Sequence, residues 1–90
     1  MNKAQLVERI ATSASLTKAQ AELVLNHTIE NICAAVKRGE EVKIVGFGTF
    51  CKQKRKARVG RNPQTGKQIK IPSSWFPKFR PGADFKDLIN

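Results

Sequence analysis

Basic side chains are concentrated in one segment of this 90-residue chain. Positions 52 to 80 carry ten of the seventeen Lys and Arg residues and no Asp or Glu residue. The rest of the chain carries seven basic and seven acidic residues, so the whole net charge of +10 comes from this segment. A cationic surface without compensating acids attracts a polyanion, above all a nucleic acid. The ten residues are Lys52, Lys54, Arg55, Lys56, Arg58, Arg61, Lys67, Lys70, Lys78 and Arg80.

Residue types that perform catalysis or bind metals lack the necessary spacing. Cys33 and Cys51 form no Cys-x-x-Cys motif, and we expect two buried or half-buried thiols in a reducing compartment. An intermolecular disulfide is the alternative. His27 stands alone, with no second histidine and no obvious acidic partner. There is no nucleophile–base pair and no phosphate-binding loop, so we expect no enzyme, no metal site and no cofactor.

The apolar residues are too scattered for a membrane protein. No stretch approaches the ~18 apolar residues of a transmembrane helix, and the N-terminus leads into an amphipathic helix rather than a signal peptide. We therefore expect a soluble cytoplasmic protein without a membrane partner.

Two helices are predicted to open the chain. Asn2 with Gln5 has the spacing of a helix cap, and Thr17 with Gln20 forms a capping box before a longer second helix. That helix is expected to stop before Gly39. Its apolar stripe is wider than one short partner helix needs, which indicates that a second chain covers it. The alternative is that the later sheet of the same chain covers it. The stripe consists of Ala21, Val24, Leu25, Thr28, Ile29, Ile32, Ala35 and Val36.

A sheet and a projecting hairpin are predicted to follow. Polar and apolar residues alternate over residues 41–44 and 68–71, and residues 49–58 are compatible with a strand. Residues 60–67 have the turn residues of a hairpin tip, and Pro72 confines the returning leg to an edge or to a ribbon outside the sheet. A leg of about sixteen residues spans roughly 50 Å, whereas a body of ~60 residues is only ~27 Å across. Part of the hairpin should therefore project.

Aromatic residues surround this hairpin. The glycines near Phe47 and Phe50, and the return of the chain at Phe79, favour a core position over base stacking for these three rings. Phe85, with Leu88 and Ile89, is predicted to line one face of a short C-terminal helix. Trp75 either packs at the base of the arm or stacks on an exposed base.

A cationic ribbon of this kind can lie in a nucleic-acid groove. Its charges neutralise phosphates, which gives affinity but little sequence information, and only Asn62 and Gln64 could read a base edge. Weak sequence preference and strong salt dependence are therefore expected. Pro63 at the tip is either a wedge that enters a base step or simply a turn former.

Three motifs resemble the HU family of bacterial histone-like proteins, and the similarity covers all 90 residues. They are Val45-Gly46-Phe47-Gly48-Thr49-Phe50, Gly60-Arg61-Asn62-Pro63-Gln64-Thr65-Gly66-Lys67 and Phe79-Arg80-Pro81-Gly82. The resemblance implies an α+β fold with a helical hairpin base, a small antiparallel sheet with a protruding two-stranded arm, a short C-terminal helix and an intertwined homodimer. It also implies binding of duplex DNA without sequence specificity, through the minor groove and the phosphates, and compaction of the bacterial nucleoid.

The resemblance divides the single domain into three parts and assigns roles to residues. Residues 1–39 are the dimerisation base, 40–82 the sheet with an arm at about 53–74, and 83–90 the last helix. Pro63 is the wedge, and the other DNA-binding residues are Lys3, Lys18, Arg55, Arg58, Arg61, Asn62, Gln64, Lys67, Lys70, Arg80 and Lys86. The dimer and core residues are Leu25, Ile29, Ile32, Val36, Ile44, Phe47, Phe50 and Phe79.

The chain departs from the family pattern in places, and two other functions fit parts of its sequence. Ala83 replaces a common basic residue, and Asn26 replaces an acidic residue that would pair with Lys3. One alternative is a subunit of a sequence-preferring heterodimer like integration host factor. Another is an RNA-binding protein, but residues 52–71 contain no aromatic residue on which a splayed base could stack, so RNA is at most a secondary ligand.

Overall fold

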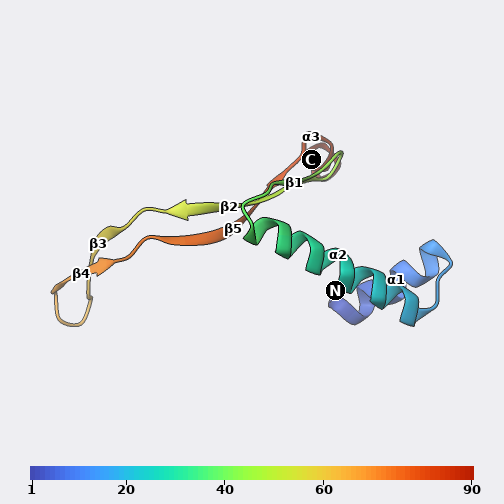
Figure 1. The fold of residues 1–90 in the computed structure, drawn as a ribbon, viewed down its shortest axis with the longest axis horizontal. Helices are drawn as coiled ribbons and strands as arrows, with labels where there is room; N and C mark the ends of the chain where they lie inside the picture. Colours follow the sequence, from blue (N-terminus) through green and yellow to red (C-terminus); the bar gives the residue numbers. More distant parts are fainter. The chain divides into compact units, whose positions relative to one another are not determined.

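The computed structural model describes residues 1–90 as three α-helices and five β-strands, which confirms the predicted α+β class (Figure 1). The chain divides into two compact units, Met1–Ala34 and Ala35–Asn90. None of the helices has the length and apolar character needed to cross a membrane. In chain order the elements are α1 (Lys3–Ala14), α2 (Lys18–Lys37), β1 (Val42–Ile44), β2 (Gly48–Arg55), β3 (Arg58–Arg61), β4 (Gln68–Ile71), β5 (Ser74–Pro81) and α3 (Ala83–Ile89).

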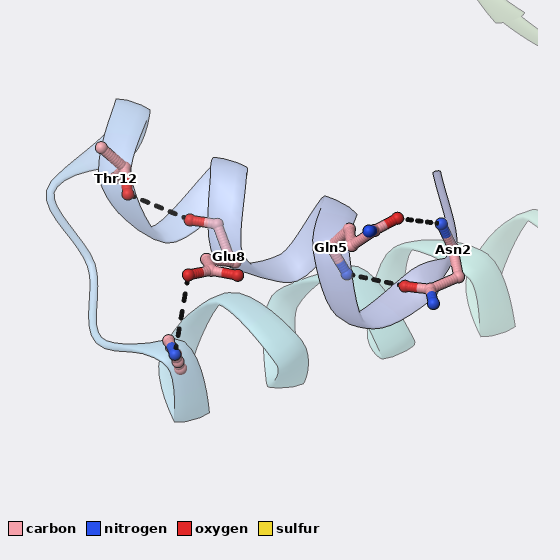
Figure 2. Close-up of polar contacts among 5 residues, drawn as sticks. Asn2, Gln5, Glu8 and Thr12 are labelled. Carbon is pink, nitrogen blue, oxygen red and sulfur yellow. Dashed lines mark hydrogen bonds and ion pairs between the residues drawn. The ribbon is translucent and has the colours of Figure 1, made fainter.

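Reciprocal hydrogen bonds begin both helices of the first unit. Asn2 Oδ1 accepts from the Gln5 amide at 2.9 Å, and Gln5 Oε1 accepts from the Asn2 amide at 2.9 Å (Figure 2). Thr17 and Gln20 form the same pair of bonds at 3.0 and 3.1 Å. These bonds satisfy backbone donors that a helix leaves free at its start. Both predicted caps are therefore confirmed.

A small apolar cluster and one ion pair join α1 to α2. Val7, Ala11 and Ala21 are buried, with Ile10 and Leu25 packed against them. Around the turn, the Glu8 carboxylate, which is labelled in Figure 2, lies 3.9 Å from Lys18 Nζ. Both side chains are exposed, so this ion pair adds little stability.

Much of the apolar stripe on α2 remains exposed in the single chain. Val24 is 54% exposed and Ile29 is 46% exposed, while Ile32 and Val36 are half-buried. The chain alone therefore leaves a surface that water would contact unfavourably. Cys33, on the same helix, is exposed, so the expectation that both cysteines are at least half-buried is wrong for Cys33. It holds for Cys51 on β2.

His27 has an acidic neighbour that the sequence interpretation overlooked. Its Nδ1 lies 3.9 Å from a Glu30 carboxylate oxygen, three residues along α2. The expectation of no acidic partner was wrong because one helical turn brings positions i and i+3 together. Both side chains are exposed, and no group of three or more His, Cys, Asp or Glu residues gathers as a metal site.

The second unit is built on a three-stranded antiparallel sheet in the order β1-β2-β5. β2 pairs with β5 along its whole length, from Gly48 opposite Pro81 to Arg55 opposite Ser74. β1 pairs only with the first residues of β2. β3 and β4 form a separate two-stranded sheet, which confirms that the leg before Pro72 lies outside the main sheet.

Four phenylalanine rings gather where this sheet meets α3. The Phe47 ring lies 5.1 Å from that of Phe79 and 5.2 Å from that of Phe85, and Phe50 lies 4.8 Å from Phe79. Such distances are typical of packed aromatic pairs. Phe47 nevertheless remains 39% exposed, so the cluster is only partly covered by its own chain. The other predicted apolar residues of α3, which are Leu88 and Ile89, are exposed.

Gly48 is required by the close approach of β2 and β5. A Cβ atom there would lie 2.5 Å from the Phe79 ring and 2.7 Å from the Arg80 carbonyl oxygen. We therefore expect Gly48→Ala to cost about 1–3 kcal/mol of folding free energy. This corresponds to a fall of the melting temperature by roughly 4–8 °C per kcal/mol, measurable by circular dichroism. Gly60→Ala is the control, because its Cβ would meet only the flexible end of Ile71 at 3.1 Å. Equal melting temperatures for the two variants would contradict this account.

Candidate nucleic-acid interface

The basic segment forms a two-stranded arm (Figure 1). Its base is the end of β2 paired with β5, and its outer part is β3 paired with β4. The ladder between β2 and β5 ends at the pair Arg55–Ser74, and the ladder between β3 and β4 begins at Arg58–Ile71. Residues 56–57 and 72–73 therefore interrupt the pairing on both sides. A single strand over residues 49–58 was expected, and this was wrong because the pairing stops at Arg55 and resumes at Arg58. Pro72, which has no amide hydrogen to donate, lies in this break.

The positive charges of the arm are almost entirely uncompensated. The four ion pairs of the chain include only one residue from the basic segment, Arg80, whose guanidinium lies 3.1 Å from the Glu41 carboxylate. Every other cation from Lys52 to Lys78 lacks an acidic partner. These like charges repel one another until an external polyanion neutralises them, so the segment is suited to a ligand with closely spaced negative charges.

Hydrogen bonds close the loop at the tip of the arm. The Asn62 amide donates to the Lys67 carbonyl oxygen at 2.9 Å, and the Gly66 amide donates to the Asn62 carbonyl oxygen at 2.8 Å. Asn62 Oδ1 also accepts from the Gln64 amide at 2.9 Å. Gly66 has a φ of +70°, which glycine adopts without strain. The loop thus presents Pro63 as an exposed ring at the tip.

Because of these bonds, the amide side chains of Asn62 and Gln64 differ in which of their atoms are free. The side-chain oxygen of Asn62 is already used within the loop, which leaves its NH₂ group as the free part. The Gln64 side chain is exposed and makes no hydrogen bond within the chain, so both its oxygen and its NH₂ group are free. Of these two amide side chains, Gln64 is therefore the one with both groups free for a bidentate contact to a base edge.

The basic residues expected to hold flanking DNA differ in their surroundings. In the first unit, Lys3 has no ion-pair partner, whereas Lys18 pairs with Glu8. In the second unit, Lys86 has no ion-pair partner, and Arg80 is held by Glu41. Lys3 and Lys86 can therefore bind a phosphate without first breaking an ion pair, while the other two must exchange one partner for another.

An aromatic and cationic cluster at the base of the arm was missed. Lys52 Nζ lies 4.7 Å and Lys54 Nζ 5.9 Å from the centre of the Trp75 ring, and the Arg55 guanidinium lies 4.9 Å from the Phe76 ring. Cations and aromatic residues are visibly close together along the sequence, but their pairing is not. That depends on the register of β2 with β5, in which Lys54 lies opposite Trp75.

Comparisons with known proteins agree with this geometry. The model of a family described as bacterial DNA-binding protein matches residues 1–90. The chain is 47% identical to DNA-binding protein HU-beta of Escherichia coli strain K12 over the full length of both proteins. It is 48% identical to DNA-binding protein HU of Clostridium pasteurianum, with 100% of this chain and 99% of that protein covered.

Solved structures of related proteins share the fold. The Anabaena HU protein crystallised with DNA superposes with a TM-score of 0.94 at 45% identity, covering 99% of this chain and 97% of that one. HU of Thermotoga maritima gives a TM-score of 0.70 at 31% identity, with both chains fully covered.

Proposed function

This chain belongs to the family of bacterial DNA-binding proteins, and on that premise we propose that it is an architectural protein that bends and wraps duplex DNA. The observation that carries the proposal is the arm, whose cations have no acidic partner between Lys52 and Lys78. Lysine and arginine side chains release counterions from phosphates, which supplies affinity for any sequence. The relatives bear the name HU rather than integration host factor, which favours this function over that of a sequence-preferring heterodimer.

The arm supplies most of the proposed contacts. Its basic residues follow the minor groove and the phosphates, and the exposed Pro63 enters a base step. Apolar wedges in the minor groove unstack a base step and kink the duplex, and HU is itself an example from which this rule is known. The residues with these roles are Arg55, Arg58, Arg61, Asn62, Gln64, Lys67 and Lys70, with Lys3, Lys18, Arg80 and Lys86 on the flanking DNA.

A second copy of the chain completes the protein. The exposed stripe around Ile29 and the half-covered ring of Phe47 are apolar surfaces that a partner chain would bury. A homodimer places two arms on one duplex, which allows a molecule of this size to wrap DNA. We place its activity in the bacterial nucleoid, where it compacts the chromosome.

Bending is the test of this function, and Pro63 is the residue to change. We expect wild-type protein to bring together dyes on the two ends of a ~35 bp duplex, which is about a quarter of the persistence length of DNA. Pro63→Ala should remove most of a kink of roughly 20–90°, because the alanine methyl group is too small to separate two base pairs. Energy transfer measures the bend, and anisotropy on the same sample measures binding, which should change by less than about tenfold.

The matched control for Pro63→Ala is Gln64→Ala. It changes the next residue but leaves the loop intact, because the bond to Asn62 Oδ1 comes from the backbone amide of residue 64. This control should bend DNA as the wild type does. If Pro63→Ala bends DNA as much as the wild type does, Pro63 only shapes the turn. Binding by the wild type without any approach of the duplex ends would overturn the bending function itself.

A further inference from the structure

Trp75 is a large aromatic side chain that the fold leaves in contact with solvent. It is 59% exposed, although it lies on a strand that is paired along its whole length. The cluster of four phenylalanine rings does not include it. Its indole ring is therefore open to a ligand.

Two ammonium groups accompany this ring. Lys52 and Lys54 lie 4.7 and 5.9 Å from its centre, a range in which a cation is attracted to the face of tryptophan. Lys52 is also fixed from the other side, because its Nζ donates to the Lys37 carbonyl oxygen at 2.9 Å at the end of α2. An ammonium group has three hydrogens, so Lys52 keeps two for a ligand. The cluster is therefore an aromatic ring with two cations over it, one held by a hydrogen bond and the other without one.

This combination matches the chemistry of a single nucleotide. A base presents a flat π-face that stacks on tryptophan, and its phosphate carries the charge that a lysine neutralises. Bases inside a duplex are covered above and below by their neighbours, so away from the duplex ends only an unpaired base can offer a free face. The cluster does not suit a duplex phosphate alone, because a phosphate gains nothing from an exposed indole ring.

We propose that Trp75, Lys52 and Lys54 form a stacking site for an unpaired base of a DNA strand that adjoins the bound duplex. The proposal rests on the proposed function, since the duplex must first lie along the arm. The site differs from the tip: the whole β3–β4 ladder and the break at residues 56–57 separate Trp75 from Pro63. A base held here is therefore additional to the step that Pro63 enters.

The chain contains a matched control beside the site. Phe76 is the next residue on β5, so its side chain points to the opposite face of the sheet. The Arg55 guanidinium lies over the Phe76 ring, but Phe76 itself is half-buried. Phe76→Leu therefore removes an aromatic ring with a neighbouring cation, and leaves the proposed stacking surface untouched.

The experiment compares three duplexes of equal length: one blunt, one with a short thymine tail and one with a tail of abasic sites. The abasic tail carries the same phosphates but no bases, so the difference between the two tails isolates stacking. We expect the wild type to bind the thymine tail about five- to 150-fold more tightly than the abasic tail, which corresponds to about 1–3 kcal/mol for a single stacked base. Trp75→Leu should bring this ratio close to one, and Phe76→Leu should keep it.

The fluorescence of the protein gives a second readout, because Trp75 is the only tryptophan in the chain. Stacking should quench its emission with the thymine tail and leave it unchanged with the abasic tail. A wild-type ratio near one, or an unchanged ratio in Trp75→Leu, would overturn the stacking site while leaving the proposed function standing. Binding of the tailed duplex without any binding of the blunt duplex would contradict the proposed function and, with it, the placement of the base beside a duplex on the arm.

Discussion

Raising the salt concentration from 50 to 200 mM should weaken the binding of duplex DNA by about 10³- to 10⁵-fold. The reason is the arm, in which nine cations from Lys52 to Lys78 have no acidic partner. If a dimer neutralises ~8 phosphates, the logarithm of the affinity should fall with the logarithm of the salt concentration at a slope near −7. Anisotropy titrations of a labelled duplex at four or five salt concentrations give this slope.

Single charge removals show which cations contribute. Arg61→Gln or Lys70→Gln should each make the slope shallower by about two per dimer, because each removes one phosphate contact from both chains. Arg9→Gln is the control: this residue lies on α1, outside the basic segment, and its loss should not alter the slope. A wild-type slope near −1 would contradict an electrostatic interface along the arm.

Ile29→Glu should prevent dimerisation and weaken DNA binding by about 10²- to 10⁴-fold, the usual gain from joining two binding modules. Ile29 lies on the exposed apolar stripe of α2 and is 46% exposed in the single chain. If a second chain covers the stripe, the substitution buries a carboxylate without a partner, which is strongly unfavourable. Light scattering after size-exclusion chromatography measures the mass, and anisotropy measures DNA binding.

Ala34→Glu is the control for this experiment. Ala34 is exposed on the same helix, five residues further on and therefore turned well away from Ile29. It should leave both the mass and the DNA affinity unchanged. The melting temperature of the wild type should rise with protein concentration, as for any protein stabilised by self-association. A monomeric wild type, or a dimeric Ile29→Glu variant with full affinity, would show that the stripe is not the interface.

Features set by neighbouring residues could be predicted from the sequence. The caps at Asn2 and Thr17 depend on a side chain three residues away, and the structure shows both. The return strand over residues 68–71 was predicted from alternation alone and agrees with β4. The break at residues 56–57 was missed because Lys56 and Ala57 are not turn-forming residues. Only Pro72, on the opposite strand, pointed to it.

Features set by distant residues could not be predicted. Arg80 reaches Glu41 across 39 positions, and this ion pair follows from the paths of both segments in space rather than from spacing. The cluster around Trp75 depends in the same way on the register of β2 and β5. The exposure of Cys33 shows a further limit, because an apolar residue type does not fix which side of a helix faces the rest of the chain.

The break in the arm separates residues that must keep a strand register from residues that need not. The register of β2 with β5 fixes which side chains face the phenylalanine cluster, and a shift of one residue would turn every one of them to the other face. Because no ladder pair crosses residues 56–57 and 72–73, a change in the tip loop does not propagate into that register. The register of the body therefore places no demand on the residues at the end of the arm, and what restricts them is the tip loop itself and the proposed contacts with DNA.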